Sequence, residues 1–556
     1  MAASEVLRSR SLASGARELV GLAGQWSTTL ATVLVLLFLI VLVALVTVNA
    51  SVWFWPAPVE EVALDDGSLL VGQLAGREAI PADDTAGPGP AHRLRFKVGN
   101  RDLDGHDFRW VDEARVTRRS RPADLIRFER SEYGDAFGRV VAATAPDGAP
   151  VDPADSSALI ALLAAGERLR TRQEALERRF ERTRRPLSRL EARLDLVERS
   201  ARAASPEARE KLARLRSECE GLRVNLTEPL AAIEQELAAV RLELARGGFR
   251  LSSGGRELEV PLAQVVEVSW PNRMGLPSRV AWAVRRLALF LTSEPREANT
   301  EGGVFPALFG TVLMVLLMSL AVVPLGVLTA VYMTEYARAG LLLRLANQAV
   351  DNLAGVPSIV FGMFGLAFFI YGVGGAVDRA FFADRLPTPT FGTGGILWAS
   401  LTLALLTVPV VVVATREGLL AVPRSWREGS LALGATRWQT LRRIVLPAAM
   451  PGILTGLILA TSRAAGEVAP LMLTGAAKLA PDLPLDGQLP FLHLERKFMH
   501  LGFHIFDVSM QSPNVEAAKP MAFATTLVLL ALVVLMNLLA IIIRRRLRRA
   551  FAGAAV

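Results

Sequence analysis

The distribution of apolar residues constrains this 556-residue chain more than any other feature of its sequence. The uncharged run Ser27–Val48 is long enough to cross the ~30 Å hydrocarbon core of a membrane. Further apolar runs follow after residue 300, and they lie at Phe305–Tyr332, Val350–Val373, Gly394–Ala414, Gly452–Leu473 and Met521–Ile543. These six runs predict a mainly α-helical, polytopic membrane protein with six transmembrane helices.

The first apolar run has two interpretations, a signal peptide and a retained membrane anchor. A signal peptide would have a shorter apolar run followed by small residues at a cleavage site. Here Trp53, Phe54 and Trp55 follow instead, which is typical of an aromatic belt at a membrane interface. We therefore expect a retained first span.

The arginine residues predict which side of the membrane each loop occupies. Arginines gather before the first run, between the fourth and fifth runs, and after the sixth run: Arg8, Arg10, Arg17, Arg416, Arg424, Arg427, Arg437, Arg442, Arg443 and Arg544–Arg546. Six spans place these three regions on one side, and the positive-inside rule makes that side cytoplasmic. The arginines that flank the spans also explain the net charge of +8. We therefore expect membrane lipid, and not nucleic acid, as a partner.

The charged region between the first two spans is expected to form an α+β insertion outside the cytoplasm. Alternating apolar and polar positions predict strands within 59–145 and 249–270. Charged stretches with apolar residues every three or four positions predict an antiparallel, coiled-coil-like helical hairpin from Ser156–Ser200 and Pro206–Arg246, with a turn at residues 200–206 capped by Ser205. Pro186 should kink or interrupt the first arm. The hairpin could dock a partner or act as a solvated spacer, and the sequence does not separate these two roles.

These patterns together predict the domain organisation. The expected parts are a cytoplasmic N-terminus (1–26), a first transmembrane helix (27–55), an extracytoplasmic insertion (56–300), a five-helix membrane core (301–545) with a cytoplasmic loop (415–451), and a cytoplasmic tail (546–556).

No motif of a catalytic or metal site supports an enzymatic role. The sequence has no Gly-x-x-x-x-Gly-Lys-Ser/Thr loop, no Gly-x-Ser-x-Gly turn and no His-Glu-x-x-His helix. The single cysteine, Cys219, is interpreted as an incidental thiol. His493, His500 and His504 precede the sixth run, and the last two are four residues apart, but no third ligand has supporting spacing, so no metal site is expected.

The loop between the fourth and fifth runs carries the sharpest pattern. Leu431, Ala435, Trp438 and Leu441 or Arg442 fall at helical spacing and could form one stripe, while Gly434 predicts two short helices that meet at a bend. Such an amphipathic element suits docking to a soluble partner, or a helix that lies on the membrane interface.

This loop resembles the EAA motif of importer-type ABC permeases. Glu428, Gly434, Ile444, Leu446 and Pro447 are in register with the motif, and Gly429 and Ser430 replace its two alanines with other small residues. The resemblance implies a coupling helix that sits in a groove of a separate ATPase subunit. The residues expected to take part are Glu428, Gly429, Ser430, Gly434, Ala435, Trp438, Ile444, Leu446 and Pro447.

A wider resemblance is to the PstA family of phosphate transport permeases. It covers roughly 26–55 and 280–545 and rests on Thr292–Gly303, Asn352–Gly362, Leu431–Thr440 and Arg463–Leu471, while the insertion is similar to that of long-form members. The resemblance implies a non-catalytic permease for inorganic phosphate that works by alternating access. It also implies a second permease subunit, two copies of an ATPase that bind ATP and magnesium, and a periplasmic phosphate-binding protein.

Two charged residues within the fifth run give the phosphate assignment a physical rationale. Arg463 and Glu467 are four residues apart, and Arg463 lies about 18 Å along a helix from Pro451, near mid-membrane. An intramembrane charge costs at least ~2.5 kcal/mol and needs a partner or a water-filled path. An arginine offers a fork of donors to an oxyanion. We therefore expect the pair to line the substrate path, and the alternative is a structural ion pair.

Smaller residues near these charges suggest where helices bend and pack. Gly466 and Pro470 would let the fifth span bend near the pair. Gly355, Pro357 and Gly362 are assigned to the third run, where small residues permit close helix packing.

Two rival functions remain open from the sequence. One is an importer of another oxyanion, such as sulfate or molybdate. The other is a membrane sensor that reads a signal through the hairpin. A sensor would be expected to carry an output domain, and the chain ends a few residues after Arg549.

Overall fold

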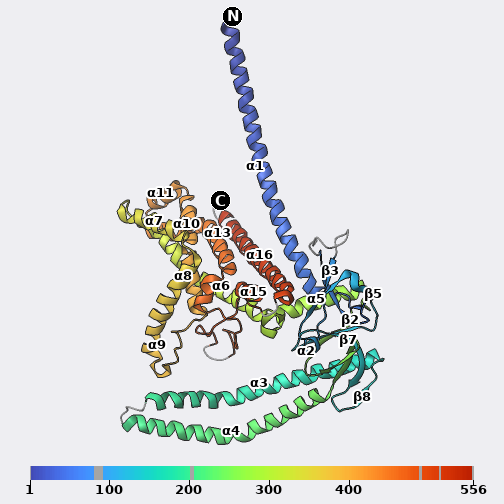
Figure 1. Ribbon diagram of the computed structural model, residues 1–556. Coiled ribbons are helices and arrows are strands. Elements are labelled where there is room, and N and C mark those ends of the chain that lie inside the picture. The colour runs from blue at the N-terminus through green and yellow to red at the C-terminus, as the bar shows by residue number, and fades with distance from the viewer. Residues whose placement is uncertain (1, 80–91, 201–205, 488–490, 513–514, 554–556) are drawn as a thin grey trace.

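The computed structural model describes residues 2–79, 92–200, 206–487, 491–512 and 515–553. Within these residues, six helices are long and apolar enough to cross a membrane, which agrees with the predicted number: Trp26–Phe54, Phe305–Tyr336, Ser358–Phe381, Ile396–Leu420, Arg437–Gly466 and Val515–Arg546. An α+β module lies between the first and second of them in the chain (Figure 1).

The helical core is built from membrane-length helices and short connecting ones. The longer helices are α1 (Ala2–Phe54), α6 (Phe305–Val331), α10 (Ile396–Leu420), α13 (Leu446–Gly466) and α16 (Val515–Gly553). The shorter ones are α7 (Leu341–Ala354), α8 (Ser358–Phe364), α9 (Gly375–Phe381), α11 (Arg424–Ala432), α12 (Arg437–Thr440), α14 (Ala469–Thr474) and α15 (Leu501–Met510). Wider π-helical turns occur at η4 (Tyr332–Tyr336), η5 (Gly365–Gly374) and η7 (Leu441–Val445).

Two of the expected spans are divided. The third was expected at Val350–Val373, but α7 ends at Ala354 and α8 begins at Ser358, because a residue before proline avoids the helical conformation and Pro357 follows Val356. The fifth was expected to run on to Leu473, but α13 ends at Gly466 and α14 starts at Ala469. The expected loop 415–451 is also shorter, since α10 continues to Leu420 and α13 begins at Leu446.

Small residues bring α10 and α13 into close antiparallel contact at the centre of the core. A Cβ added to Gly452 would lie 2.7 Å from the Gly418 Cα, and one added to Gly456 would lie 2.9 Å from the Ala414 Cβ. Side chains would therefore push the two helices apart. The same contacts fix the register, because a step of four residues along α13 matches a step of four back along α10.

The module contains two antiparallel sheets. The first has the order β4-β3-β2-β1-β5, and the second β10-β9-β7-β6-β11 with β8 paired to β7. Their bounds are β1 Glu60–Leu64, β2 Leu69–Ala79, β3 His92–Lys97, β4 Phe108–Asp112, β5 Val116–Ser120, β6 Ile126–Arg130, β7 Ala136–Thr144, β8 Pro150–Val151, β9 Gly248–Ser253, β10 Arg256–Pro261 and β11 Val265–Ser269. Short elements at α2 (Arg101–Asp104), η1 (Glu113–Arg115), β12 (Pro295–Arg296), η3 (Glu297–Asn299) and β13 (Glu301–Gly302) complete the connections.

The helical hairpin grows out of the second sheet. Its helices are α3 (Ser156–Ser200) and α4 (Pro206–Arg246), with the bounds that the sequence predicts. Pro186 was expected to kink or interrupt the first arm; α3 is not interrupted there, since it continues through this residue, and it packs against α4. The predicted turn, with its Ser205 cap, lies outside the described residues. At the base of the hairpin, Leu162 and Val240 pack with Phe249 in the core of the module.

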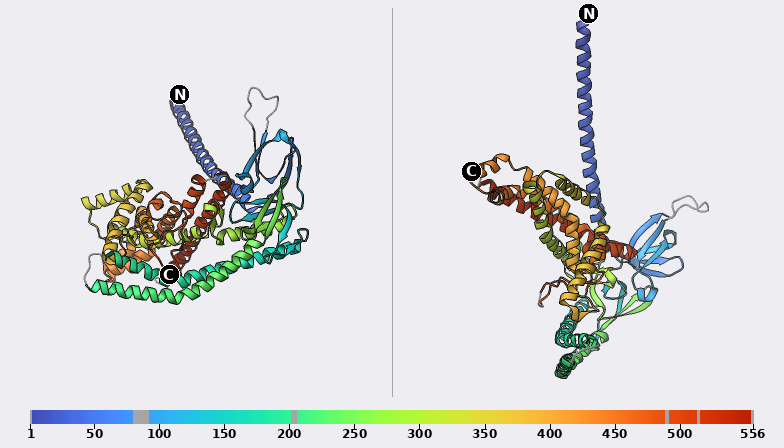
Figure 2. Two further views of the ribbon diagram at one scale, coloured as in Figure 1. Left: turned by 60° about the horizontal axis from the view of Figure 1, so that its bottom comes forward. Right: turned by 90° about the vertical axis from the view of Figure 1, so that its left-hand side faces the viewer.

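The hairpin and the module lie at one end of the core, and the coupling region lies at the other. Figures 1 and 2 show α3 and α4 crossing the end of the core from which α9 projects. There α3 contacts η6 (Ala383–Arg385), which follows α9. Both chain termini, α7 and α11 lie toward the opposite end (Figure 1). We call these ends the module side and the bend side.

Candidate functional site

The segment between α10 and α13 folds as a bend, which we call the coupling bend (Arg424–Val445). Helix α11 ends at Ala432, and Gly434 has a φ of +84°, in the left-handed region that glycine adopts without strain. Thr436 then caps α12: its hydroxyl accepts a hydrogen bond from the Gln439 amide at 3.2 Å, and the Gln439 side chain accepts one from the Thr436 amide at 2.8 Å. The predicted bend at Gly434 is confirmed.

One face of the coupling bend is held against the core. The hydroxyl groups of Ser430 and Thr440 lie 2.9 Å apart across the bend and are buried. Leu441 and Val445 pack into an apolar cluster with Leu419 at the end of α10. Small size at position 430 is therefore needed for packing, as the sequence predicts.

Arg427 ties the coupling bend to two spans at once. Its guanidinium donates to the Glu335 carboxylate at 3.1 Å, to the Leu419 carbonyl at 2.6 Å and to the Val422 carbonyl at 2.8 Å. Glu335 belongs to the π-helical end of the second span, and Leu419 to the end of the fourth. The coupling bend is therefore attached to the ends of both helices.

The other face of the coupling bend is apolar and exposed. Its exposed large side chains are Trp426, Leu431, Leu433 and Trp438, and Leu433 is 91% exposed. Glu428 and Gly429 are exposed on the same element, while Ala435, Ile444, Leu446 and Pro447 are half-buried. Of the two residues that could have ended a single stripe, Leu441 is buried against the core, while Arg442 is exposed like Leu431 and Trp438. A Cβ on Gly429 would meet nothing within 4 Å, so packing inside the chain does not require glycine there.

The second part of the site is a break in the fifth span. Arg463 lies in the last turn of α13, which ends at Gly466. Glu467 was expected to be helical, but its backbone is extended, with φ −75° and ψ 137°. The Arg463 Nε nevertheless donates to the Glu467 Oε1 at 3.3 Å, so the predicted pair forms. Arg463 thus stands at the C-terminal end of α13, where the unpaired backbone carbonyls carry a partial negative charge that favours a cation.

The helix register places this break near the middle of the span. Gly452 lies against Gly418, and Gly456 against Ala414. Continued in the same register, Arg463 is level with Thr407, close to the midpoint of α10. Non-helical backbone at such a depth occurs where it is buried in protein or lines a water-filled path.

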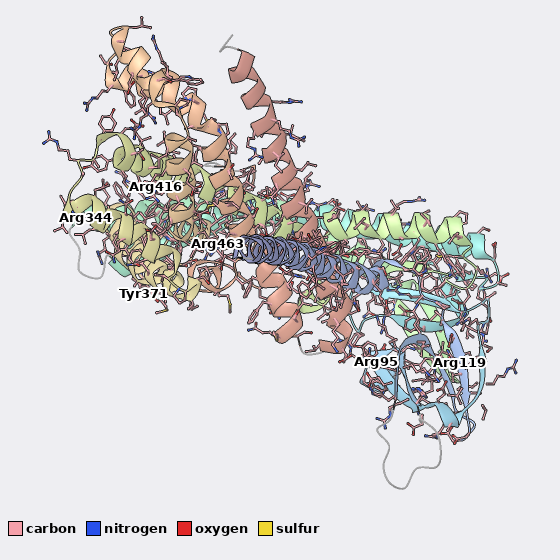
Figure 3. The ribbon with its side chains drawn as sticks, turned by 90° about the horizontal axis from the view of Figure 1, so that it is seen from above. Arg95, Arg119, Arg344, Tyr371, Arg416 and Arg463 are labelled. Carbon is pink, nitrogen blue, oxygen red and sulfur yellow. The ribbon has the colours of Figure 1, made fainter. Side chains whose placement is uncertain are left out.

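The surroundings of the break are small and polar. A Cβ on Gly466 would meet nothing within 4 Å, whereas one on Gly362 would lie 2.8 Å from the Pro470 Cα, so α8 packs closely on α14. Packing is thus the role of Gly362, while Gly355 and Pro357 lie between α7 and α8. The Ser462 hydroxyl donates to Asn537 of α16 at 2.7 Å. The Arg463 side chain is 38% exposed, which leaves the guanidinium N–H groups that do not bond Glu467 available. Figure 3 shows Arg463 in the core, apart from Arg95 and Arg119 of the module.

The three histidines before the sixth span make separate contacts. His500 caps α15 by accepting a hydrogen bond from the Gly502 amide, and His504 lies 3.5 Å from the Thr525 hydroxyl. His493 bonds Asp486 and Glu495 elsewhere in the same loop region. Across the described residues, no group of three or more metal-ligating side chains is assembled.

Comparisons with known proteins show the family of the chain. The family described as the inner membrane component of binding-protein-dependent transport systems matches residues 322–549. The phosphate transport system permease protein PstA of Yersinia pestis is 34% identical over 257 residues, which are 46% of this chain and 77% of that protein. The chain belongs to the family of inner-membrane transport permeases that includes PstA.

Other relatives match shorter stretches. PstA 1 of Mycobacterium tuberculosis (strain CDC 1551 / Oshkosh) is 42% identical over 171 residues, which are 31% of this chain and 50% of the relative. The probable ABC transporter permease protein YqgH of Bacillus subtilis is 34% identical over 202 residues, which are 35% of this chain and 61% of the relative. The chain thus spans between half and about three quarters of the length of these relatives.

Solved structures of methionine and alginate ABC transporters align with the chain at TM-scores of 0.32 and 0.31. They are 17% and 16% identical to it, and each covers 43% of this chain and 94% or 78% of the other.

Arg427, Glu335 and the Thr436 cap are the residues that the sequence-based site omits. The cap has a readable signal, because Thr-x-x-Gln is a capping box. Arg427 stands next to Glu428 of the motif, but its acceptors lie in other elements, and Glu335 is 92 residues away in the sequence.

Proposed function

We propose that this chain is the permease subunit of an ATP-driven importer that moves inorganic phosphate across the inner membrane. The observation that carries the proposal is the broken fifth span, where the partly exposed Arg463 stands level with the middle of α10. A guanidinium fork in a low-dielectric environment favours a small oxyanion. The PstA relatives support phosphate as that oxyanion.

Glu467 gives the path a second state. With no anion present, its carboxylate satisfies Arg463 through the 3.3 Å contact. An incoming phosphate competes for the same donors, so the arginine is never left as an unpaired charge in the membrane. Exchange between an internal and an incoming anion keeps binding reversible, as transport requires.

The coupling bend receives the driving force. Its exposed apolar side chains, among them Trp426 and Trp438, and the exposed Glu428 of α11 suit a groove on a separate ATPase. We infer that ATP and magnesium are bound by that ATPase, present in two copies, and that the chain itself is non-catalytic. A second permease subunit and a periplasmic phosphate-binding protein complete the complex, and both termini of this chain are cytoplasmic.

Uptake of labelled phosphate by cells that lack their native permease tests the proposal. We expect Arg463→Gln to abolish saturable uptake and Glu467→Gln to weaken it, while Arg463→Lys retains part of it because the charge is kept without the fork. Arg344→Gln is the matched control, because Arg344 is an exposed arginine of α7 outside the site. Normal uptake by Arg463→Gln at wild-type abundance would remove Arg463 from the path.

Competition separates phosphate from other oxyanions. Excess unlabelled phosphate should suppress the uptake, whereas sulfate and molybdate should not. Suppression by sulfate or molybdate at equal concentration would reassign the substrate and leave the permease assignment intact.

A further inference from the structure

Helix α5 (Leu276–Thr292) connects the module to the second span and is strongly two-sided. Its buried face carries Trp282 and Phe290. The Phe290 ring packs on Trp53 and Phe54 at the end of α1, with centroid distances of 6.1 and 5.4 Å. This face of α5 therefore packs against the end of the first span.

Charged side chains anchor the same buried face to the module. The Arg286 guanidinium bonds the Glu129 carboxylate of β6 and stacks over the rings of Trp53 and Trp282, 5.4 and 5.1 Å from their centroids. The Arg279 Nε donates to the Met274 carbonyl at 3.1 Å. These contacts determine which way α5 is turned about its own axis.

The opposite face is apolar and, within the described residues, exposed from Leu276 to Ala288, while Leu291 at its end packs against the apolar cluster of Phe290 and Val304. Leu276, Val280, Val284 and Leu287 are 69%, 48%, 62% and 41% exposed. At 100° per residue they share an arc of about 80°, and the exposed Pro277, Ala281 and Ala288 extend it to about 140° without a charge. An aliphatic arc of this width on a water-facing helix would be costly, so an apolar phase is expected to cover it.

The position of α5 identifies that phase. The helix packs on the last residues of α1, whose apolar side chains are exposed over their membrane-length run, and it leads through β12 and β13 into α6. With 17 residues and three arginines it is too short and too charged to cross the membrane itself. Its level is therefore the membrane surface on the module side.

We propose that α5 lies in the plane of the membrane surface on the module side, with its charge-free arc among the lipid acyl chains. Arg285, outside the arc, then stands at the height of the lipid headgroups, where a long basic side chain reaches water. Because Arg286 fixes α5 to β6, the membrane plane also sets the orientation of the module and of the hairpin that extends from it.

Site-directed spin labelling of the full-length chain tests this placement. Cys219→Ala removes the single native thiol, and single cysteines are introduced at Val280 and Val284 on the arc and at Ser278 and Arg285 off it. The chain, purified with its associated subunits, is reconstituted into phospholipid vesicles. All four positions are exposed, although Ser278 donates a hydrogen bond to the Gly275 carbonyl and Arg285 lies 3.9 Å from the Glu267 carboxylate. Elution of each variant as a single peak of wild-type size confirms an intact protein.

Collision with oxygen, which concentrates among acyl chains, is compared with collision with a water-soluble nickel chelate. We expect the ratio of oxygen to nickel accessibility to be severalfold higher at Val280 and Val284 than at Ser278 and Arg285. Equal ratios, with nickel reaching the arc, would place α5 in water and overturn the proposal. Protection of the arc from both reagents would show that a protein subunit covers it, and would overturn the proposal equally.

Discussion

At the scale of single residues, Arg427 has the clearest structural role in the coupling bend. Its guanidinium reaches one carboxylate and two carbonyls that belong to different spans. Lysine keeps the charge but cannot hold three acceptors in a fixed plane. We expect Arg427→Lys to lower phosphate uptake severalfold and to destabilise the bend by about 1–3 kcal/mol, since buried acceptors lose their donors.

The measurement for Arg427 is uptake normalised to the amount of chain in the membrane. Arg437→Lys is the control, because Arg437 is exposed on α12 within the same segment. Glu335→Gln should resemble Arg427→Lys in direction. Full uptake by Arg427→Lys, together with unchanged thermal stability, would show that these contacts do not carry the coupling.

Glu301 predicts a pH dependence of the module. Burial, together with the nearby Asp135 carboxylate, raises the pKa of Glu301 to about 7 from an ordinary 4.5. Between these two pH values the folded protein holds a proton that the unfolded chain has released, so stability falls as the pH rises through this window. At pH 8 the cost is at most about 3 kcal/mol. We expect Glu301→Gln to melt at a higher temperature than wild type at pH 8, and at nearly the same temperature at pH 4.5.

The neighbouring Glu297 provides the control for this melting experiment. Its carboxylate is paired with Arg101 at 3.2 Å and accepts a hydrogen bond from the Gly134 amide at 3.1 Å. Glu297→Gln should therefore lower the melting temperature at pH 8 rather than raise it. A melting difference between Glu301→Gln and wild type that does not change from pH 4.5 to 8 would contradict the assignment of the titrating group.

At the scale of elements, the backbone at Gly434 sets the angle between α11 and α12. A non-glycine residue in the left-handed region costs roughly 1–2 kcal/mol. Space is not the limit, since a Cβ there meets nothing within 4 Å. We expect Gly434→Ala to reduce phosphate uptake by turning the exposed face away from its partner, and Gly434→Asn to reduce it less, because asparagine tolerates this conformation.

Gly429→Ala is the matched control for Gly434. The position is inside α11, so alanine should favour the helix by about 1 kcal/mol and leave the bend unchanged. Uptake measured beside the copurification of ATPase with the chain separates docking from transport. Equal uptake by Gly434→Ala and Gly429→Ala would show that the left-handed residue is not needed.

The sequence predicted those elements whose causes are local. The bend follows from Gly434 and its spacing, and the hairpin arms follow from their periodicity. Gly466 and Pro470 also predicted a bend in the fifth span, and α13 does end at Gly466, with Pro470 in the first turn of α14. The full break and the packing of Pro470 on Gly362 of α8 were not predicted, because an apolar run alone cannot reveal a contact with another element. The Arg463–Glu467 ion pair was predicted because the two residues are four positions apart in the sequence. The pair still forms although Glu467 is extended rather than helical.

At the scale of the whole molecule, ion pairs make the module and the core one structure. Burial alone would raise the pKa of Glu129, but Arg286, Arg127 and Arg296 hold it at about 2. These cations come from α5, β6 and β12, and Arg286 is 157 residues from Glu129 in the sequence. Such long-range pairing could not be derived from spacing. It holds the module to α5 and β12, the elements that lead into α6.

The arrangement of the two ends leads to a prediction about sidedness. The coupling bend and both termini lie toward one end of the core, and the module lies at the other (Figure 1). Arginines flank the spans in the short loops at the first end, and short cytoplasmic loops carry such an excess, whereas long domains cross the membrane regardless of their charge. In a Cys219→Ala background, cysteines replace Leu433, which is 91% exposed on the coupling bend, and Arg118, which is exposed on the module.

A membrane-impermeant maleimide applied to intact spheroplasts should then label Arg118→Cys and spare Leu433→Cys, and lysis should make both reactive. The lysed sample is its own control, because it shows that each thiol is accessible once the membrane barrier is gone. Labelling of Leu433→Cys before lysis would place the coupling bend outside the cell, where no ATPase could drive it. The broken span would then lack its source of energy, and the importer function would have to be abandoned even if Arg463 binds phosphate.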